Sequence, residues 1–172
     1  MQDFLGFAKD RYSVRSFKSE PVEQEKIDLI LEAAKAAPTA CNKQPQKIYV
    51  VKSVEKRELL AKLSPCTFGA PVVFVIGYDR EISAKGYLSD DFDFGTIDAS
   101  IVCTHMMFEA HDLGLGSCWV GYFNEKQLKS ELDLPSRIQI CALLPVGYAS
   151  DNAEPNVLHT TRRDVEEIYT EL

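Results

Sequence analysis

The sequence predicts a layered α/β or α+β domain, and two observations carry that prediction. Two apolar runs of strand length, 71–78 and 139–148, lack the alternation of a half-exposed strand. Segments whose apolar residues recur at helical spacing separate most of the strand-like runs. A central sheet with helices packed against it satisfies both patterns.

The first half of the chain supplies two helices and two strands in this scheme. The segment 21–37 is expected to form a helix, because its apolar residues fall at helical spacing and Pro38 follows. The β-branched run 47–52 predicts a strand, and the charged segment 55–63 predicts a surface helix. The run 71–78 is then the candidate central strand.

The segment 96–113 is apolar on almost every side, so the helix predicted there has no wide solvent face. In so small a domain, such a helix suggests a subunit interface. Gly114 is expected to end it in the left-handed conformation. A short strand at 117–120 and a surface helix at 125–132 follow, before the buried strand at 139–148.

The carboxyl-terminal stretch 152–159 is polar and contains Pro155, which predicts an extended arm. Such an arm could carry Arg162 and Arg163 back to the basic residues near the amino terminus, or across to a partner subunit.

Composition narrows the class of protein. The chain has 172 residues, 45% of them hydrophobic, and no linker-like segment divides it, so we expect a single domain spanning 1–172. A net charge of -7 argues against nucleic acid as a partner. The five cysteines are scattered and never in C-x-x-C spacing, which favours a reducing cytoplasm over a disulfide framework or a zinc site. No run reaches the ~18 apolar residues of a membrane span.

Basic residues gather at both ends of this acidic chain. Arg11, Ser13 and Arg15 alternate, so an extended segment would point their side chains to one side. Arg162 and Arg163 lie near the other end. Guanidinium groups and a hydroxyl suit a phosphate monoester, which carries roughly two charges and three acceptor oxygens. We therefore expect one compact anion site.

Other patterns carry less chemistry. Gly114, Gly116 and Gly121 lead from a helix into a strand, the opposite of a dinucleotide-binding turn. No phosphate-binding P-loop or G-x-S-x-G motif is present in the sequence. His105 and His111 fall on different helix faces, so we expect structural roles and no metal site.

The loop 38–46 places amide and hydroxyl side chains between two prolines. Taken alone, it is most simply a polar connection from helix to strand. Amides can also donate to and accept from the edge of a planar heterocycle, so recognition of such a ligand stays open.

Four motifs occur in a specific order along nearly the whole chain: R-x-S-x-R-x-F, A-P-[ST]-x-x-N-x-Q-P, L-G-L-G-S-x-W-x-G and L-P-x-G-Y. In this the sequence resembles the nitroreductase-like family of FMN-dependent oxidoreductases. The resemblance implies an α+β fold with a mixed central sheet flanked by helices, a long buried interface helix and an extended carboxyl-terminal arm. It also implies an obligate homodimer with FMN at the subunit interface.

The resemblance further implies where FMN would bind. The first basic cluster and a tail arginine would hold the phosphate and ribityl chain, and the loop after Pro38 would come from the other subunit, with Asn42 at the flavin ring. The segment 119–121 would present backbone N–H groups to the reactive edge. No side chain is expected to be catalytic, because the chemistry is centred on the flavin. The implied cofactor-binding residues are Arg11, Tyr12, Ser13, Arg15, Pro38, Thr39, Ala40, Asn42, Trp119, Val120, Gly121, Arg162 and Arg163.

The implied activity is an NAD(P)H oxidoreductase working in two half-reactions through flavin N5, with an electron-poor acceptor such as a nitroaromatic or quinone. The sequence does not decide whether NADH or NADPH is the electron donor. Reductive dehalogenation or another specialised flavin chemistry remains an alternative, as does a flavin-binding sensor without turnover. The chain departs from many members in having Gln46 where a Trp is frequent, and only a short segment, 79–94, remains to cover the flavin. Tyr87 in that cover does not choose between these alternatives.

Overall fold

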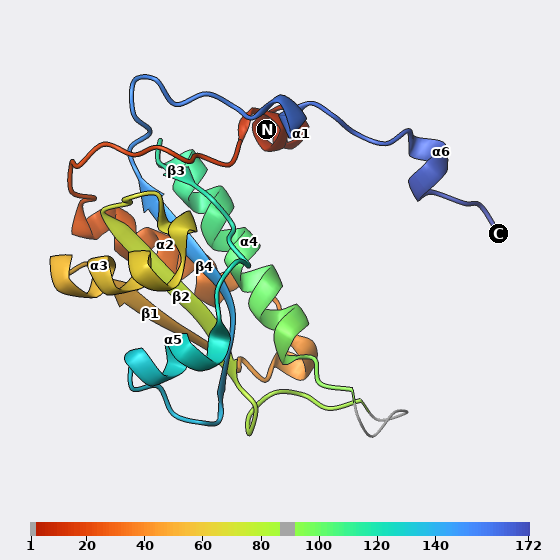
Figure 1. The fold of residues 1–172 in the computed structure, drawn as a ribbon. Coiled ribbons are helices and arrows are strands. Elements are labelled where there is room, and N and C mark those ends of the chain that lie inside the picture. Colours follow the sequence, from red (N-terminus) through yellow and green to blue (C-terminus); the bar gives the residue numbers. More distant parts are fainter. Residues whose placement is uncertain (1–2, 87–91) are drawn as a thin grey trace.

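The computed structural model of the chain describes residues 3–86 and 92–172. Four strands form one sheet, and helices flank it on both faces (Figure 1). The strands are β1 (Gln46–Val51), β2 (Val72–Asp79), β3 (Gly116–Ser117) and β4 (Ile138–Gly147). The α-helices are α1 (Phe4–Asp10), α2 (Gln24–Ala36), α3 (Val54–Leu63), α4 (Gly95–Asp112), α5 (Glu125–Glu131) and α6 (Val165–Ile168). The 3-10 turns are η1 (Ala40–Asn42), η2 (Pro65–Thr67) and η3 (Val157–His159).

The sheet has the strand order β1-β2-β4-β3, so β2 and β4 are interior. The prediction of β2 as a central strand is confirmed, and every residue of that strand is buried. Neighbouring strands of the sheet pair antiparallel, so the four-stranded sheet is not the expected mixed one. A parallel contact occurs as an isolated bridge between Ser13 and Ser117. The register of β2 against β4 shifts between Ile76 and Gly77.

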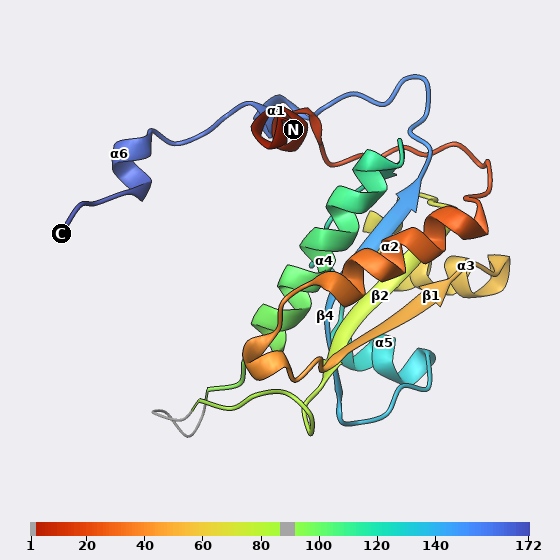
Figure 2. The ribbon, with the colours of Figure 1, turned by 180° about the vertical axis from the view of Figure 1, so that it is seen from behind.

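Two hydrophobic cores lie on opposite faces of the sheet. On one face, α2 and α4 cover alternate residues of β2, including Phe74 and Ile76 (Figure 2). On the other face, α3 and α5 cover Val73 and Val75 through Leu60 and Leu128 (Figure 1). This alternation of side chains explains why β2 is apolar throughout.

The long helix α4 packs one side against the sheet, with Val102, Cys103 and Met106 fully buried. Its other side leaves Ile97 45% exposed. Gly114 ends the helix with a φ of 74°, as predicted from its position. In the described part of the chain, no helix is long and apolar enough to cross a membrane.

The two ends of the chain leave the sheet. Helix α1, which the sequence patterns did not predict, lies against the carboxyl-terminal end of α4, with the Phe7 ring 5.9 Å from the Phe108 ring. After β4 the chain forms the predicted extended arm, interrupted by the turn η3. The arm then runs away from the body of the molecule and carries α6 with it (Figures 1 and 2). All residues from 160 onward are exposed in the isolated chain.

Candidate functional site

The first basic cluster lies at the end of the edge strand β3. Val14 donates its N–H to the Ser117 carbonyl at 2.9 Å, which fixes the segment after α1 alongside β3. Arg11, Ser13 and Arg15 all act on the Cys118 thiol from this segment. Burial raises the pKa of that thiol. The positive charges of Arg15 and Arg11, and a hydrogen bond with Ser13, oppose the rise. The three predicted side chains therefore all influence one buried thiol.

The tail adds one arginine to this cluster. Burial lowers the pKa of the Arg11 guanidinium; Cys118 opposes this, and the positive charge of Arg162 adds to the lowering. Among the described residues, neither Arg11 nor Arg162 forms an ion pair with a carboxylate. Two neighbouring guanidinium groups without a counter-charge are suited to an anion such as a phosphate.

Several members of the predicted set have hydrogen-bond partners in this chain. Arg162 donates from Nη1 to the Thr161 carbonyl at 2.8 Å and to the Leu158 carbonyl at 3.4 Å. Arg15 donates from Nη1 to the Ser13 carbonyl at 3.2 Å. Arg163 donates from Nε to Glu167 at 2.9 Å within the arm. The Tyr12 hydroxyl donates to the Ala153 carbonyl at 3.4 Å, and its ring meets His159 edge-on. Tyr12 thus ties the start of the arm to the basic cluster.

The segment after β3 continues the sheet edge. Val120 and Leu143 exchange both backbone hydrogen bonds, each of 2.9 Å. Because peptide groups alternate in direction along an extended chain, Trp119 and Gly121 turn their N–H groups away from β4. Neither of these N–H groups has a hydrogen-bond partner among residues 3–86 and 92–172. The expectation that Val120 also presents its N–H is corrected, because that group is already paired within the sheet.

A side chain shields this open edge. A Cβ built on Gly121 would lie 3.2 Å from Cζ3 of the Trp119 ring, so the indole packs over the glycine. Trp119 itself is 39% exposed. The edge therefore combines two free donors with an aromatic side chain beside them.

The loop after α2 holds several residues in a strained backbone conformation. Cys41, Asn42 and Gln44 have φ values of 52°, 50° and 48°, the left-handed region that non-glycine residues seldom adopt. Ala40 donates its N–H to the buried Asp98 carboxylate at 2.8 Å, and Gln44 donates to Thr39 Oγ1 at 3.0 Å. These bonds hold the strained backbone, while the Asn42 side chain stays exposed.

The loop and the basic cluster lie at opposite ends of α4 (Figures 1 and 2). The loop contacts Asp98 in the first turn of the helix. Arg11 lines a cavity of about 230 Å³ with His111 and Gly114 at the other end. A helix of 18 residues is about 27 Å long at 1.5 Å per residue. One chain therefore does not bring the two predicted halves of the site together.

The outer side of α4 carries two adjoining grooves. One, of about 550 Å³, lies between α1, α2 and α4 and is lined by Phe4, Phe7 and Phe108. The other, of about 370 Å³, extends along α4 past Ile97 and Ile101. An apolar surface of this kind is typical of a protein interface.

The histidines have structural surroundings in this chain. His105 Nδ1 lies 2.9 Å from the Ile101 carbonyl, and the His111 ring packs on Phe7 at 4.8 Å. Among the residues that the structure describes, no group of three or more metal-ligating side chains comes together.

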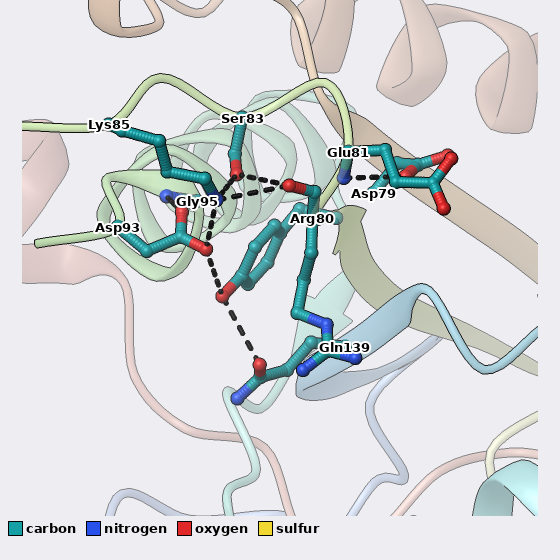
Figure 3. Close-up of polar contacts among 9 residues, drawn as sticks. Asp79, Arg80, Glu81, Ser83, Lys85, Asp93, Gly95 and Gln139 are labelled. Atoms are coloured by element: carbon teal, nitrogen blue, oxygen red, sulfur yellow. Dashed lines mark hydrogen bonds and ion pairs between the residues drawn. The ribbon is translucent and has the colours of Figure 1, made fainter. Parts of the chain in front are cut away.

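The segment between β2 and α4, which the sequence suggests as a cover, is fastened at both of its ends. The Asp93 carboxylate accepts from Lys85 Nζ at 2.7 Å and from the Gly95 N–H at 2.8 Å (Figure 3). Lys85 also donates to the Ser83 hydroxyl at 2.8 Å and to the Arg80 carbonyl at 3.0 Å. These bonds anchor the base of the segment next to the first turn of α4, whereas Tyr87 lies outside the described residues.

A second ion pair supports the same end of the sheet. Arg137 Nε donates to the buried Asp79 carboxylate at 2.8 Å, and the Glu81 N–H donates to the same carboxylate at 3.0 Å. Burial acts to raise the pKa of Asp79, but the Arg137 hydrogen bond and the Glu81 amide outweigh it and hold the pKa below its ordinary value.

Comparison with known proteins gives consistent results across the chain. A model of the nitroreductase family matches residues 8–65 and 61–148. A protein of Archaeoglobus fulgidus, provisionally named NADH dehydrogenase/NAD(P)H nitroreductase, is 30% identical over 164 residues, which are 90% of either chain. FMN reductase [NAD(P)H] of Bacillus subtilis is 30% identical over 173 residues, covering 89% of this chain and 68% of the relative.

Solved structures give the same result. A nitroreductase family protein of Clostridium difficile superimposes with a TM-score of 0.91 at 34% identity, covering 98% of both chains. A protein of Desulfovibrio desulfuricans, assigned as a nitroreductase and solved in complex with FMN, superimposes with a TM-score of 0.84 at 27% identity. That alignment covers 100% of this chain and 98% of the other.

Proposed function

This chain belongs to the nitroreductase family, and from that premise we propose that it transfers electrons from NAD(P)H to an electron-poor acceptor such as a nitroaromatic or a quinone. It is an FMN-dependent oxidoreductase, in keeping with relatives named NAD(P)H nitroreductase and FMN reductase. The five cysteines are all free, which supports a reducing, cytoplasmic setting.

The observation that carries the proposal is the open sheet edge beside an uncompensated basic cluster. Arg11 and Arg162 would hold the phosphate, with Ser13 and Arg15 at the ribityl chain. The free N–H groups of Trp119 and Gly121 follow directly along the same edge and would meet the acceptor atoms of the flavin ring. The basic cluster and the free N–H groups along the edge thus fit a single cofactor that has a phosphate at one end and a heterocycle at the other.

The chain's own groups divide the work of holding and orienting. Bound FMN supplies the atom, N5, that accepts and releases hydride. The Trp119 and Gly121 N–H groups would orient that edge of the ring with fixed donors, which need no reorganisation during the reaction. The Trp119 indole covers part of the edge and limits the approach of water.

A second copy of the chain would complete the site. The loop at 38–46 lies at the far end of α4 from Arg11, so its Asn42 amide can join the site only from another subunit. The apolar grooves along α4 and the extended arm support such a homodimer. A small-molecule acceptor would enter between the subunits, where the strained loop would present its amides.

The test is an absorption spectrum of the purified protein titrated with FMN, followed by anaerobic addition of NADH and then NADPH. We expect flavin bands that shift on binding and bleach with at least one nicotinamide. Bound flavin that does not bleach would favour a sensor without turnover. Bleaching followed by reoxidation with halogenated phenols but not with nitro compounds or quinones would favour a dehalogenase.

A further inference from the structure

The carboxylate of Asp98 joins the loop after α2 to the first turn of α4. Its Oδ1 accepts from the Ala40 N–H at 2.8 Å. Among the described residues, no other hydrogen bond joins the turn 39–44 to a helix or strand. Residues 41–44 are all exposed, so packing does not hold them. Between the buried residues Ala37 and Pro45, the turn is therefore attached to the molecule through Asp98.

The remaining hydrogen bonds of the turn lie within it. Asn42 donates its N–H to the Thr39 carbonyl at 2.9 Å, and Gln44 donates to Thr39 Oγ1 at 3.0 Å. The Thr39 carbonyl and the Ala40 N–H belong to one peptide group. This group is thus bonded to the turn on one side and to α4 on the other. The internal bonds fix the shape of the turn, and the bond to Asp98 fixes its place.

The part of α4 that carries this carboxylate is firmly packed. Asp98 is 2% exposed, and Ala99 and Val102 next to it are fully buried in the core between α4 and the sheet. A Cβ built on Gly95 would overlap the Tyr78 ring of β2, so the first turn of the helix lies directly on the sheet. A bond to Asp98 therefore fixes the turn 39–44 relative to the sheet as well as to the helix.

Stability does not explain a carboxylate at this position. Its second oxygen, Oδ2, is buried and has no hydrogen-bond partner in the described part of the chain. None of the ion pairs among these residues includes Asp98. Burial of an incompletely paired carboxylate costs stability, and the helix N-terminus offsets only part of that cost. Residues that break a packing rule in this way are typical of functional sites.

We propose that Asp98 is a positioning residue that holds the Asn42 amide of its own chain in place for the flavin bound by the other subunit. This inference rests on the proposed function, which brings the turn to the flavin site of a second copy. Asn42 ends the short turn η1 that Ala40 begins, so loss of the Asp98 bond would displace the Asn42 side chain. Arg11, at the other end of α4, should stay in place.

The experiment compares Asp98→Ala with Asp98→Asn and with Asp79→Asn. Asp98→Ala removes the acceptor of the Ala40 N–H, whereas Asp98→Asn keeps an oxygen that can accept it. Asp79 is the matched control, because its buried carboxylate binds Arg137 and the Glu81 N–H and not the turn. For each variant we would measure the Kd for oxidised FMN and the amide hydrogen exchange of Ala40.

For Asp98→Ala we expect the Kd to rise about three- to tenfold, the range for loss of one hydrogen bond from the Asn42 amide. Exchange at Ala40 should accelerate. Asp98→Asn and Asp79→Asn should keep the Kd within about twofold of the unaltered protein. An unchanged Kd in Asp98→Ala would overturn the positioning role. A Kd in folded Asp98→Asn as weak as that of Asp98→Ala would overturn it too.

Mixing of subunits shows which half of the site is damaged. After dissociation and reassociation with Arg11→Ala protein, Asp98→Ala protein should regain about one quarter of the tight FMN sites. Half of the randomly paired dimers then combine an intact Arg11 with an intact turn at one of their two sites. With Asn42→Ala protein it should regain none, because every site has a damaged turn. The reverse pattern would overturn the proposal, since it would place the damage in the half that contains Arg11.

A mixture of Arg11→Ala and Asn42→Ala proteins separates this proposal from the proposed function. Recovery in that mixture, without recovery when Asp98→Ala is mixed with Arg11→Ala, would reject the role of Asp98 alone. No recovery in that mixture would reject the shared site and the role of Asp98 with it. If the unaltered protein binds no FMN, the proposed function itself fails.

Discussion

Arg162 and Arg163 are neighbours in sequence, but their surroundings differ. Arg162 lies near Arg11, whereas Arg163 is paired with Glu167 inside the arm. We predict that Arg162→Ala weakens FMN binding by about 1.5–3 kcal/mol, the range for a hydrogen bond to a charged group. Arg163→Ala serves as the matched control and should weaken it several-fold less. Equal effects in fluorescence titrations would show that the tail binds differently once FMN is present.

Asp79 gives the protein an acid-sensitive contact. Its pKa in the folded state is below the ordinary value of 3.8, so the unfolded chain binds the proton more readily. Stability from this pair is therefore present above about pH 4 and is lost as the pH falls through the folded pKa. We predict that Asp79→Asn flattens the fall in stability between about pH 5 and pH 3, measured by urea unfolding.

The partner of Asp79 offers an independent check on this pH dependence. Arg137→Gln should flatten the same part of the profile, because it removes the charge and the donor that hold the pKa down. The double variant should then add little to either single change. A pH profile that keeps its slope in both single variants would assign the acid sensitivity to other carboxylates.

Among the elements, the β2/β4 pair depends on one glycine. A Cβ on Gly77 would overlap the Gln139 carbonyl oxygen, which belongs to the backbone of β4 and cannot move aside. We predict that Gly77→Ala costs about 3 kcal/mol of stability, the upper part of the usual range for overpacking. Gly114→Ala, which meets open space at a φ of 74°, should cost about 1 kcal/mol through backbone strain alone. Urea unfolding of both variants tests whether Gly77→Ala lowers the stability more than Gly114→Ala does.

Most helices and strands could be predicted from the spacing of apolar residues and from the prolines and glycines that end them. The exceptions have physical causes. Helix α1 has seven residues and none of them is buried, so no apolar stripe marks it. Its visible signal was the Asp3 cap, which accepts from the Gly6 N–H at 3.1 Å. Strand β3 is shorter than the predicted 117–120, because only the bridge of Val120 to Leu143 continues the pairing beyond Ser117.

The sequence indicated which segments would form the site, but not which backbone N–H groups of the segment 119–121 would be free to donate. Alternating residues in the first cluster indicated a common side, and Arg11, Ser13 and Arg15 all influence the pKa of the Cys118 thiol. Which N–H groups of the segment 119–121 remain free depends on the register against β4, and no local pattern reveals that register.

At the scale of the whole molecule, the two halves of the site should come from different chains. Mixing an Arg11→Ala protein with an Asn42→Ala protein, after dissociation and reassociation, tests this directly. A heterodimer would contain one site with both residues intact, so random pairing should restore about one quarter of the tight FMN sites in a two-fold dimer. The measurement is FMN bound at limiting concentration.

The same experiment has a clear negative result. If Arg11 and Asn42 served one site within a single chain, both members of every mixed dimer would stay defective, and mixing would restore nothing. Sedimentation of a flavin-loaded monomer would contradict the shared site as well. Either finding would require the arm and the grooves along α4 to have another role.

The sheet edge at Trp119 and Gly121 also has a consequence for handling the protein without its cofactor. An unpaired row of backbone donors and acceptors is a template on which a strand of another molecule can add. Here the edge borders an exposed indole and lacks the lysine or proline that commonly blocks such growth. Cofactor-free protein should therefore self-associate at this edge more readily than FMN-bound protein, which light scattering of the two forms would show.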